Sequence, residues 1–261
     1  QGILKWLKDS EEMVKNQKSP SIDYPVVKAQ LQEQKFLMKM INDNQNSVTS
    51  ILKLGEEVLL GCEPSEKNNI EMQLRDLTSR FDDLKDNSND RTKLLENSVD
   101  IAKALQDQLN PLVSFLDRAE KSLKNLENIP SDEDKLHQAI FEHDRLNKEI
   151  LQKDPDVESL IALKNNIRKC FQPEEAEIAN EKIDAVSDRY NMLKDDSERL
   201  GALLNKTKQE TRQFNLAYND LFAWCDKQER VIAQYKNISV HVDVITEQVN
   251  KLEDINSEVR G

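Results

Sequence analysis

Residues 3–13 read ILKWLKDSEEM, a central aromatic residue flanked by apolar positions and followed by a glutamate. The pattern recurs as LVSFLDRAEKSL at 112–123 and as LFAWCDKQERVI at 221–232, so that Trp6, Phe115 and Trp224 are evenly spaced. We call the interval from Trp6 to Phe115 the repeat period. A second landmark keeps it, because DLTSRFDDLKDNS at 76–88 returns as AVSDRYNMLKDDS at 185–197. Two unrelated landmarks with one period indicate a duplicated structural unit.

The period predicts three domains. We expect a repeat over 1–98 whose first helix is truncated at its N-terminus, a complete repeat over 99–207, and a partial third repeat over 208–261 with its first helix and part of its second. We therefore expect the chain to be a window of a longer array, with much of the parent protein's function outside it.

Composition narrows the class of protein. Charged residues make up 33% and hydrophobic residues 37% of the 261 residues, with only five glycines. This balance is typical of long helices with narrow apolar seams. The net charge of −12 argues against nucleic-acid binding, which relies on clustered Lys and Arg, and against acidic membrane surfaces. No apolar run approaches the roughly 18 residues of a membrane span.

Each repeat is expected to contain three helices, A, B and C. Heptad spacing, which alternates steps of 3 and 4, predicts one apolar stripe per helix. In the second A helix the stripe is Leu105, Leu109, Leu112, Leu116, Ala119, Leu123 and Leu126. In the third it is Phe214, Tyr218, Leu221, Cys225, Gln228, Ile232 and Tyr235. We expect that third A helix to persist as an extension of the preceding C helix, and its B helix to be fragile.

The C helices carry equivalent stripes. The second comprises Ile183, Val186, Tyr190, Leu193, Ser197, Leu200 and Leu204. The first comprises Leu74, Leu77, Phe81, Leu84, Ser88, Arg91 and Leu95, in which two consecutive polar positions predict a loosened bundle with Arg91 snorkelling outward. The first B helix is expected over about 24–60, packing through Val27, Leu31, Phe36, Met40, Val48, Ile51, Leu54 and Val58, and the second over about 132–170.

Turn residues predict where helices begin and break. Ser131 is the expected N-cap of the second B helix. No linker separates the repeats, so each C helix is expected to continue into the next A helix. Pro111 predicts a bend near 109–112 or a helix that restarts there, and Pro155 predicts an interruption of the second B helix after Asp154.

The sequence offers no catalytic chemistry, and we expect no enzyme activity, no cofactor and no metal. His137 and His143 are six residues apart, the wrong helical phase for joint metal binding, so His137, His143 and His241 are interpreted as surface or seam-edge residues. Trp6 and Trp224 are interpreted as core residues between helices. Cys62, Cys170 and Cys225 are odd in number and far apart, which predicts reduced thiols in a cytosolic protein.

The WLxxxE pattern around Trp6, its counterparts at 115 and 224, and the Arg–aromatic pairs of the C helices resemble the spectrin repeat. That resemblance implies an all-α fold of tandem three-helix, left-handed coiled-coil bundles joined by continuous helices into an elongated rod. QKSPSIDYPVVKAQLQEQKF at 17–36, CEPSEK at 62–67 and LNPLVSFLDRAEKSL at 109–123 look like the rod of the spectraplakins, the dystonin and microtubule-actin crosslinking factor family. Departures from the vertebrate pattern suggest an invertebrate or divergent member.

The resemblance implies a cytoplasmic, cytoskeletal rod segment that spaces and mechanically couples filament-binding ends carried elsewhere in the parent protein. Its partners would be cytoskeletal proteins, without nucleic acid or membrane insertion, and we expect the fragment to be monomeric. The alternative is a protein-docking or lateral-dimerisation module, with dystrophin-like, nesprin-like and spectrin parents still open. Ile161, Ile167 and Phe171 are the candidate outer apolar positions for docking.

Overall fold

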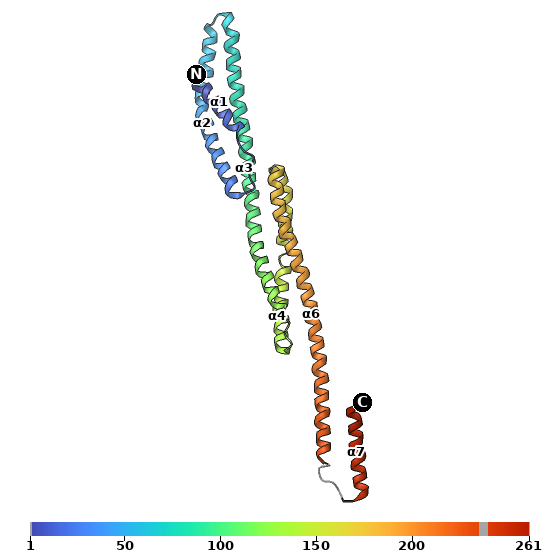
Figure 1. Cartoon of the computed structure of the whole chain (residues 1–261). Helices are drawn as coiled ribbons and strands as arrows, with labels where there is room; N and C mark the ends of the chain where they lie inside the picture. The colour runs from blue at the N-terminus through green and yellow to red at the C-terminus, as the bar shows by residue number, and fades with distance from the viewer. Residues whose placement is uncertain (1, 235–239, 261) are drawn as a thin grey trace. The chain divides into compact units, whose positions relative to one another are not determined.

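The computed structural model describes residues 2–234 and 240–260, and within these ranges the chain is built from helices with no β-strand (Figure 1). The helices are α1 (Gly2–Lys15), α2 (Tyr24–Gly61), α3 (Pro64–Leu126), α4 (Glu133–Leu151), α5 (Asp154–Cys170), α6 (Pro173–Gln234) and α7 (Val242–Arg260). The all-α prediction is confirmed.

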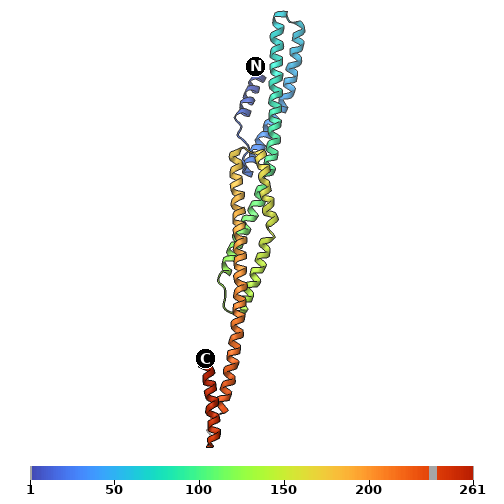
Figure 2. The same ribbon diagram turned by 90° about the vertical axis from the view of Figure 1, so that its right-hand side faces the viewer.

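Two helices cross the predicted repeat boundaries without interruption. Helix α3 has 63 residues and combines the first C helix with the second A helix, while the 62-residue α6 combines the second C helix with the third A helix. Both helices can be followed in Figures 1 and 2. The predicted continuity of C helices into A helices is confirmed, including the persistence of the third A helix.

Proline affects the two predicted sites differently. Pro111 lies inside α3, so a helix that restarts there was a wrong prediction, and the bend stays a prediction. The second B helix is interrupted as expected, but the break precedes Asp154: α4 ends at Leu151 and α5 starts at Asp154. Pro155 therefore occupies the first turn of α5, where its missing amide hydrogen costs no helical bond.

The start of α4 corrects the predicted cap. The backbone nitrogen of Lys135 donates to Oδ1 of Asp132 at 3.0 Å, so Asp132 provides the capping oxygen that we expected from Ser131. An aspartate at this position also places a negative charge beside the exposed amides of the helix N-terminus.

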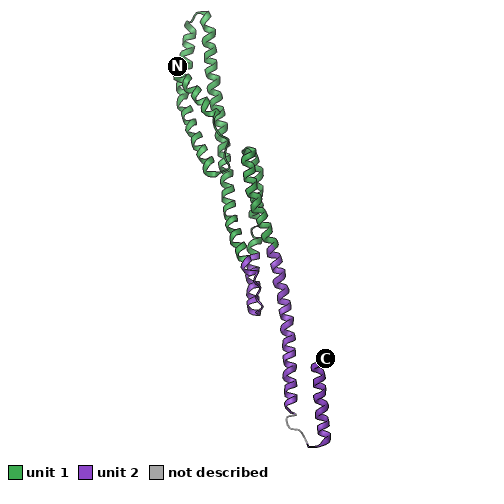
Figure 3. Ribbon diagram, in the orientation of Figure 1, with its two compact units in different colours: residues 1–122, 148–195 green, residues 123–147, 196–261 purple. Residues whose placement is uncertain are grey.

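The chain divides into two compact units (Figure 3). Unit 1 comprises residues 1–122 and 148–195, and unit 2 comprises residues 123–147 and 196–261. The division passes through α3, α4 and α6 and does not follow the repeat period. The boundaries 1–98, 99–207 and 208–261 therefore stay predictions.

In unit 1, α1, α2 and the first part of α3 enclose a common core. Its buried members are Leu7, Leu37, Ile41, Val48, Leu77, Phe81 and Leu84. The half-buried Trp6 packs against this cluster, with its ring 6.3 Å from that of Phe81, as expected for a residue between helices.

The predicted face of α2 was partly wrong. Phe36, Leu54 and Val58 are exposed, and the buried stripe instead runs through Val27, Gln34, Ile41 and Val48 at strict seven-residue steps. Gln34 is 1% exposed, so a polar residue holds a core position. The sequence pattern had favoured Phe36 because Gln34 interrupts the apolar series.

The seams of the second repeat agree closely with the sequence pattern. The predicted core residues Leu116, Leu123, Tyr190 and Leu193 are all buried. The remaining members of the C stripe, Ile183, Val186, Ser197, Leu200 and Leu204, are buried as well. In the A stripe, Leu109 and Leu126 are half-buried and the other five are buried.

The start of the third repeat has an uncovered seam. Phe214, Tyr218 and Leu221 are 69%, 56% and 60% exposed, although the rings of Phe214 and Tyr218 stack 6.4 Å apart. Cys225 and Ile232 are exposed, Trp224 and Gln228 are half-buried, and Tyr235 lies outside the described residues. Helix α7 has no buried residue, and the fragility of this B helix stays a prediction.

Candidate functional site: polar contacts that tie the helices together

No group of three or more His, Cys, Asp or Glu that could hold a metal ion occurs among the described residues. None of the helices within the described ranges is long and apolar enough to cross a membrane. Cys62 and Cys170 are half-buried free thiols and Cys225 is an exposed one. The features with functional potential are polar contacts between helices, which recur at the period of the sequence.

The first recurring contact joins helix A to helix C through an arginine and a glutamate. Nε and Nη2 of Arg80 donate to the two carboxylate oxygens of Glu11 at 2.9 and 2.8 Å. One repeat period later, Nε and Nη2 of Arg189 donate to Glu120 at 3.1 and 2.9 Å. The paired, planar geometry fixes the rotation of helix A against helix C.

Both arginines are about one-third exposed, so each pair contributes little net stability. The hydrogen bond from Arg80 lowers the pKa of Glu11, and the hydrogen bond to Glu11 in turn raises the pKa of Arg80. Arg189 also donates to Asp117 at 2.6 Å, and the hydrogen bonds to its two carboxylates raise its pKa. These contacts orient the helices more than they stabilise them.

The second recurring contact is buried and joins helix B to the backbone of helix C. Nε2 of Gln34 donates to the carbonyl of Ser88 at 2.9 Å. In the second repeat, Nε2 of His143 lies 2.8 Å from the carbonyl of Ser197, and because a carbonyl only accepts, this nitrogen carries the hydrogen. A buried polar group needs such a partner, which pins the B helix to one register on the C helix.

His143 was predicted at the surface or the seam edge and is in fact 5% exposed. Its ring is accommodated by Gly201, where an added Cβ would lie 2.7 Å from Cε1 of His143. The Oγ of Ser197 lies 3.2 Å from Nε2 of His143 and donates to Oδ1 of Asn147 at 3.0 Å. His137 and His241 are exposed, as expected.

The third recurring contact joins the middle of helix B to helix C through a lysine. Nζ of Lys85 donates to Oε1 of Gln45 at 3.1 Å, and the equivalent Lys194 donates to Oδ1 of Asp154 at 2.8 Å. In the second repeat the hydroxyl of Tyr190 adds bonds to Asp154 and to the carbonyl of Ile150, at 2.9 and 2.8 Å. Burial and the neighbouring Asp154 raise the pKa of Tyr190.

The Asp154 contact predicts a pH dependence. Hydrogen bonds from Lys194 and then Tyr190 lower the pKa of Asp154, so its contribution is present above the pKa of the unfolded state and is lost as pH falls through the folded value. We expect the wild type to lose more thermal stability than Asp154→Asn between about pH 5 and about pH 2. Melting midpoints over this range check it, with the exposed Asp195→Asn as control. Parallel curves for wild type and Asp154→Asn would contradict the assignment.

One further contact links the two repeats inside unit 1. The backbone nitrogen of Ile22, in the segment between α1 and α2, donates to Oε2 of Glu175 at 2.7 Å, and Oγ of Ser21 lies 3.3 Å from the same oxygen. Ile22 is buried, and so is Phe171 just before α6. Of the docking candidates Ile161, Ile167 and Phe171, only Ile161 is exposed, so Ile167 and Phe171 belong to the buried side of the bundle and do not form an outer surface.

Comparison with known proteins agrees with this architecture. Residues 1–97 match the spectrin-repeat family. The chain is 30% identical to mouse microtubule-actin cross-linking factor 1, isoforms 1/2/3/4, over 231 residues that cover 88% of the chain and 3% of the mouse protein. It is 30% identical to the human isoforms 6/7 over 88% of the chain and 7% of that protein, and to the rat protein over 94% and 4%.

The chain thus spans less than a tenth of the length of these relatives. The similarity to microtubule-actin cross-linking factors confirms the resemblance to the spectraplakin rod that the sequence predicts. The invertebrate origin stays a prediction. With a spectrin-repeat match over residues 1–97, helices continuous across both predicted repeat boundaries and similarity to these factors over most of its length, the chain belongs to the spectrin-repeat family.

Proposed function

We propose that the chain is a structural spacer of a cytoskeletal crosslinker, which holds filament-binding ends of the parent protein apart and passes tension between them. The observation that carries the proposal is the unbroken α3, a single 63-residue helix shared by two successive repeats. A helix that belongs to two bundles transmits bending and pull from one to the other, as in other solenoid-like arrays whose units interact with their neighbours. The names of the relatives describe cross-linking of microtubules and actin.

The recurring polar contacts support the same role. Each repeat orients A against C by an arginine–glutamate pair, and a buried amide or imidazole holds B in one register on C, so B resists sliding along C. The Glu175 link adds a contact between successive repeats, beside the shared helix. A cytoplasmic, cytoskeletal location and cytoskeletal partners follow from this proposal.

Small-angle X-ray scattering over a concentration series tests the proposal. A compact globule of this length has a radius of gyration of about 18 Å, whereas a rod of two and a half bundles, each roughly 50 Å long from its helix lengths, has one of about 30 Å or more. We expect the larger value, independent of concentration. A value near that of the globule would refute the spacer, and a particle mass that doubles with concentration would favour lateral assembly.

A further inference from the structure

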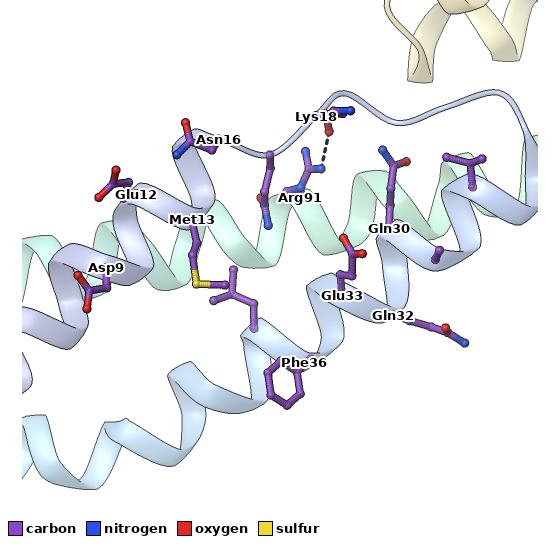
Figure 4. A pocket seen from close by; sticks show the side chains of 14 residues that line it. Asp9, Glu12, Met13, Asn16, Lys18, Gln30, Gln32, Glu33, Phe36 and Arg91 are labelled. Atoms are coloured by element: carbon purple, nitrogen blue, oxygen red, sulfur yellow. Dashed lines mark hydrogen bonds between the residues drawn. The ribbon is translucent and has the colours of Figure 1, made fainter.

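The first repeat has a groove between α1 and α2. It is a cavity of about 1130 Å³ in unit 1, lined by the end of α1, the segment that follows it, the first half of α2, and Arg91 of α3 (Figure 4). A groove of this size, open to solvent, can accommodate the apolar face of a peptide segment.

Apolar side chains line this groove but remain in contact with solvent. Met13 is 49% exposed, Val26 45% and Phe36 65%, while Leu37 beside them is buried. Figure 4 shows Met13 extending from α1 toward α2, and Phe36 on α2. Contiguous exposed apolar side chains with a polar rim are typical of interaction sites.

The rim carries more acidic than basic side chains. Asp9 and Glu12 on α1 and Glu33 on α2 line the groove and are exposed, whereas the basic side chains of the lining are Lys18 and Arg91, of which Arg91 is bonded to the carbonyl of Lys18. None of these three carboxylates forms an ion pair with another described residue. A partner with cationic side chains around an apolar face would complement this rim and bury the apolar residues.

Arg91 lines the groove from α3. It occupies a seam position of helix C, where the second repeat has the buried Leu200, and its Nη2 donates to the carbonyl of Lys18 at 2.6 Å. A guanidinium needs polar partners that a leucine does not, so at this position a polar contact to the segment after α1 takes the place of apolar packing. Burial lowers the pKa of Arg91, and among the described residues its buried Nε has no hydrogen-bond acceptor.

The second repeat shows that the fold does not require these residues. One repeat period later, Met13, Val26 and Phe36 correspond to Ser122, Lys135 and Arg145. The acidic Asp9 and Glu12 correspond to Arg118 and Lys121. Glu33 alone keeps its charge, as Glu142. The same type of bundle therefore forms without the apolar residues and without the carboxylates of Asp9 and Glu12, so folding does not require them.

We propose that this groove binds an amphipathic helix of a partner protein, with its apolar face on Met13, Val26 and Phe36 and its lysines or arginines on Asp9, Glu12 and Glu33. A helix suits the site because α1 and α2 present ridges of side chains between which a further helix packs. The net charge of −12 attracts a basic segment from a distance. The groove is a binding site in addition to the spacer role and does not depend on it.

The test is a titration of the 261-residue protein against a fluorescent probe peptide, read by anisotropy. The probe is a helix of about 18 residues with leucines at i, i+3, i+4 and i+7 and lysines elsewhere. A scrambled peptide of the same composition is the peptide control. We expect the amphipathic probe to bind at least about tenfold more tightly than the scrambled one.

Two variants copy the second repeat and therefore retain residues compatible with the fold. Val26→Lys with Phe36→Arg removes the apolar face, and Asp9→Arg with Glu12→Lys reverses the rim. Each is expected to weaken binding of the amphipathic probe by at least about tenfold, while Met72→Arg, at an exposed apolar residue outside the groove, leaves binding unchanged. Unchanged melting curves show that the variants remain folded.

Equal binding of the scrambled probe, or equal binding by the variants that copy the second repeat, would overturn the proposal, because general attraction to an acidic protein would then suffice. A concentration-dependent doubling of mass that the Val26→Lys, Phe36→Arg variant abolishes would also overturn it. In that case the occupant would be a second copy of this chain.

Discussion

The substitution Leu116→Asp should unfold the second repeat. Leu116 is fully buried in α3, on the stripe that faces the other helices of its bundle. A carboxylate there loses its hydration without gaining a partner, at a cost of several kcal/mol, and the leucine packing is lost as well. The sum is comparable with the total stability of about 5–15 kcal/mol of a typical domain.

Circular dichroism and chemical denaturation measure this effect. At 25 °C we expect the helical signal to fall by roughly the share that the second repeat contributes, while the first repeat stays folded. Met192→Asp is the matched control, since Met192 lies on α6 of the same repeat and is 65% exposed. A Leu116→Asp protein with the melting curve of the wild type would show that this stripe is not the core.

The substitution Lys103→Pro should separate the unfolding of the two repeats. Lys103 is exposed in the part of α3 that joins them, so its side chain contributes no core packing. Proline in a helix interior removes one backbone hydrogen bond and clashes with the preceding turn, at about 3 kcal/mol. If the shared helix couples the repeats, this local cost should appear as a loss of cooperativity.

We expect one unfolding transition in the wild type and two in Lys103→Pro, measured by urea denaturation with helical content as the signal. Lys103→Ala is the control, because it removes the same side chain and keeps the amide. Two transitions already present in the wild type would contradict mechanical coupling through α3.

Pro111→Ala gives the reverse test. It should sharpen the unfolding transition, since it restores a helical hydrogen bond further along the same helix.

Most of the architecture could be predicted because the seams obey a simple period. Every predicted position of the second C stripe is buried, including Ser197, because a seven-residue step in a helix returns each side chain to the same face. The errors in α2 have the same origin. The buried face of α2 is set by the seven-residue step, and Gln34 lies on that face because it fits the step, although its side chain is polar.

The buried contacts of Gln34 and His143 were missed because each residue, taken alone, is ordinary for a surface. A signal was present in the sequence: Gln34 and His143 are separated by one repeat period, as are Ser88 and Ser197. Polar residues at equivalent places in both repeats indicate a shared constraint that a single repeat cannot reveal. The bond between Ile22 and Glu175 offered no such signal, because it depends on the path of an irregular segment.

Gly201 limits how such repeats can be recombined. It leaves room for the imidazole of His143, whereas the corresponding position of the first repeat holds Thr92, which shares the carbonyl of Ser88 with the amide of Gln34. A chimaera that joined the second B helix to the first C helix would place a threonine side chain where the ring of His143 needs space. We therefore expect the B and C helices of a repeat to be exchangeable only as a matched pair.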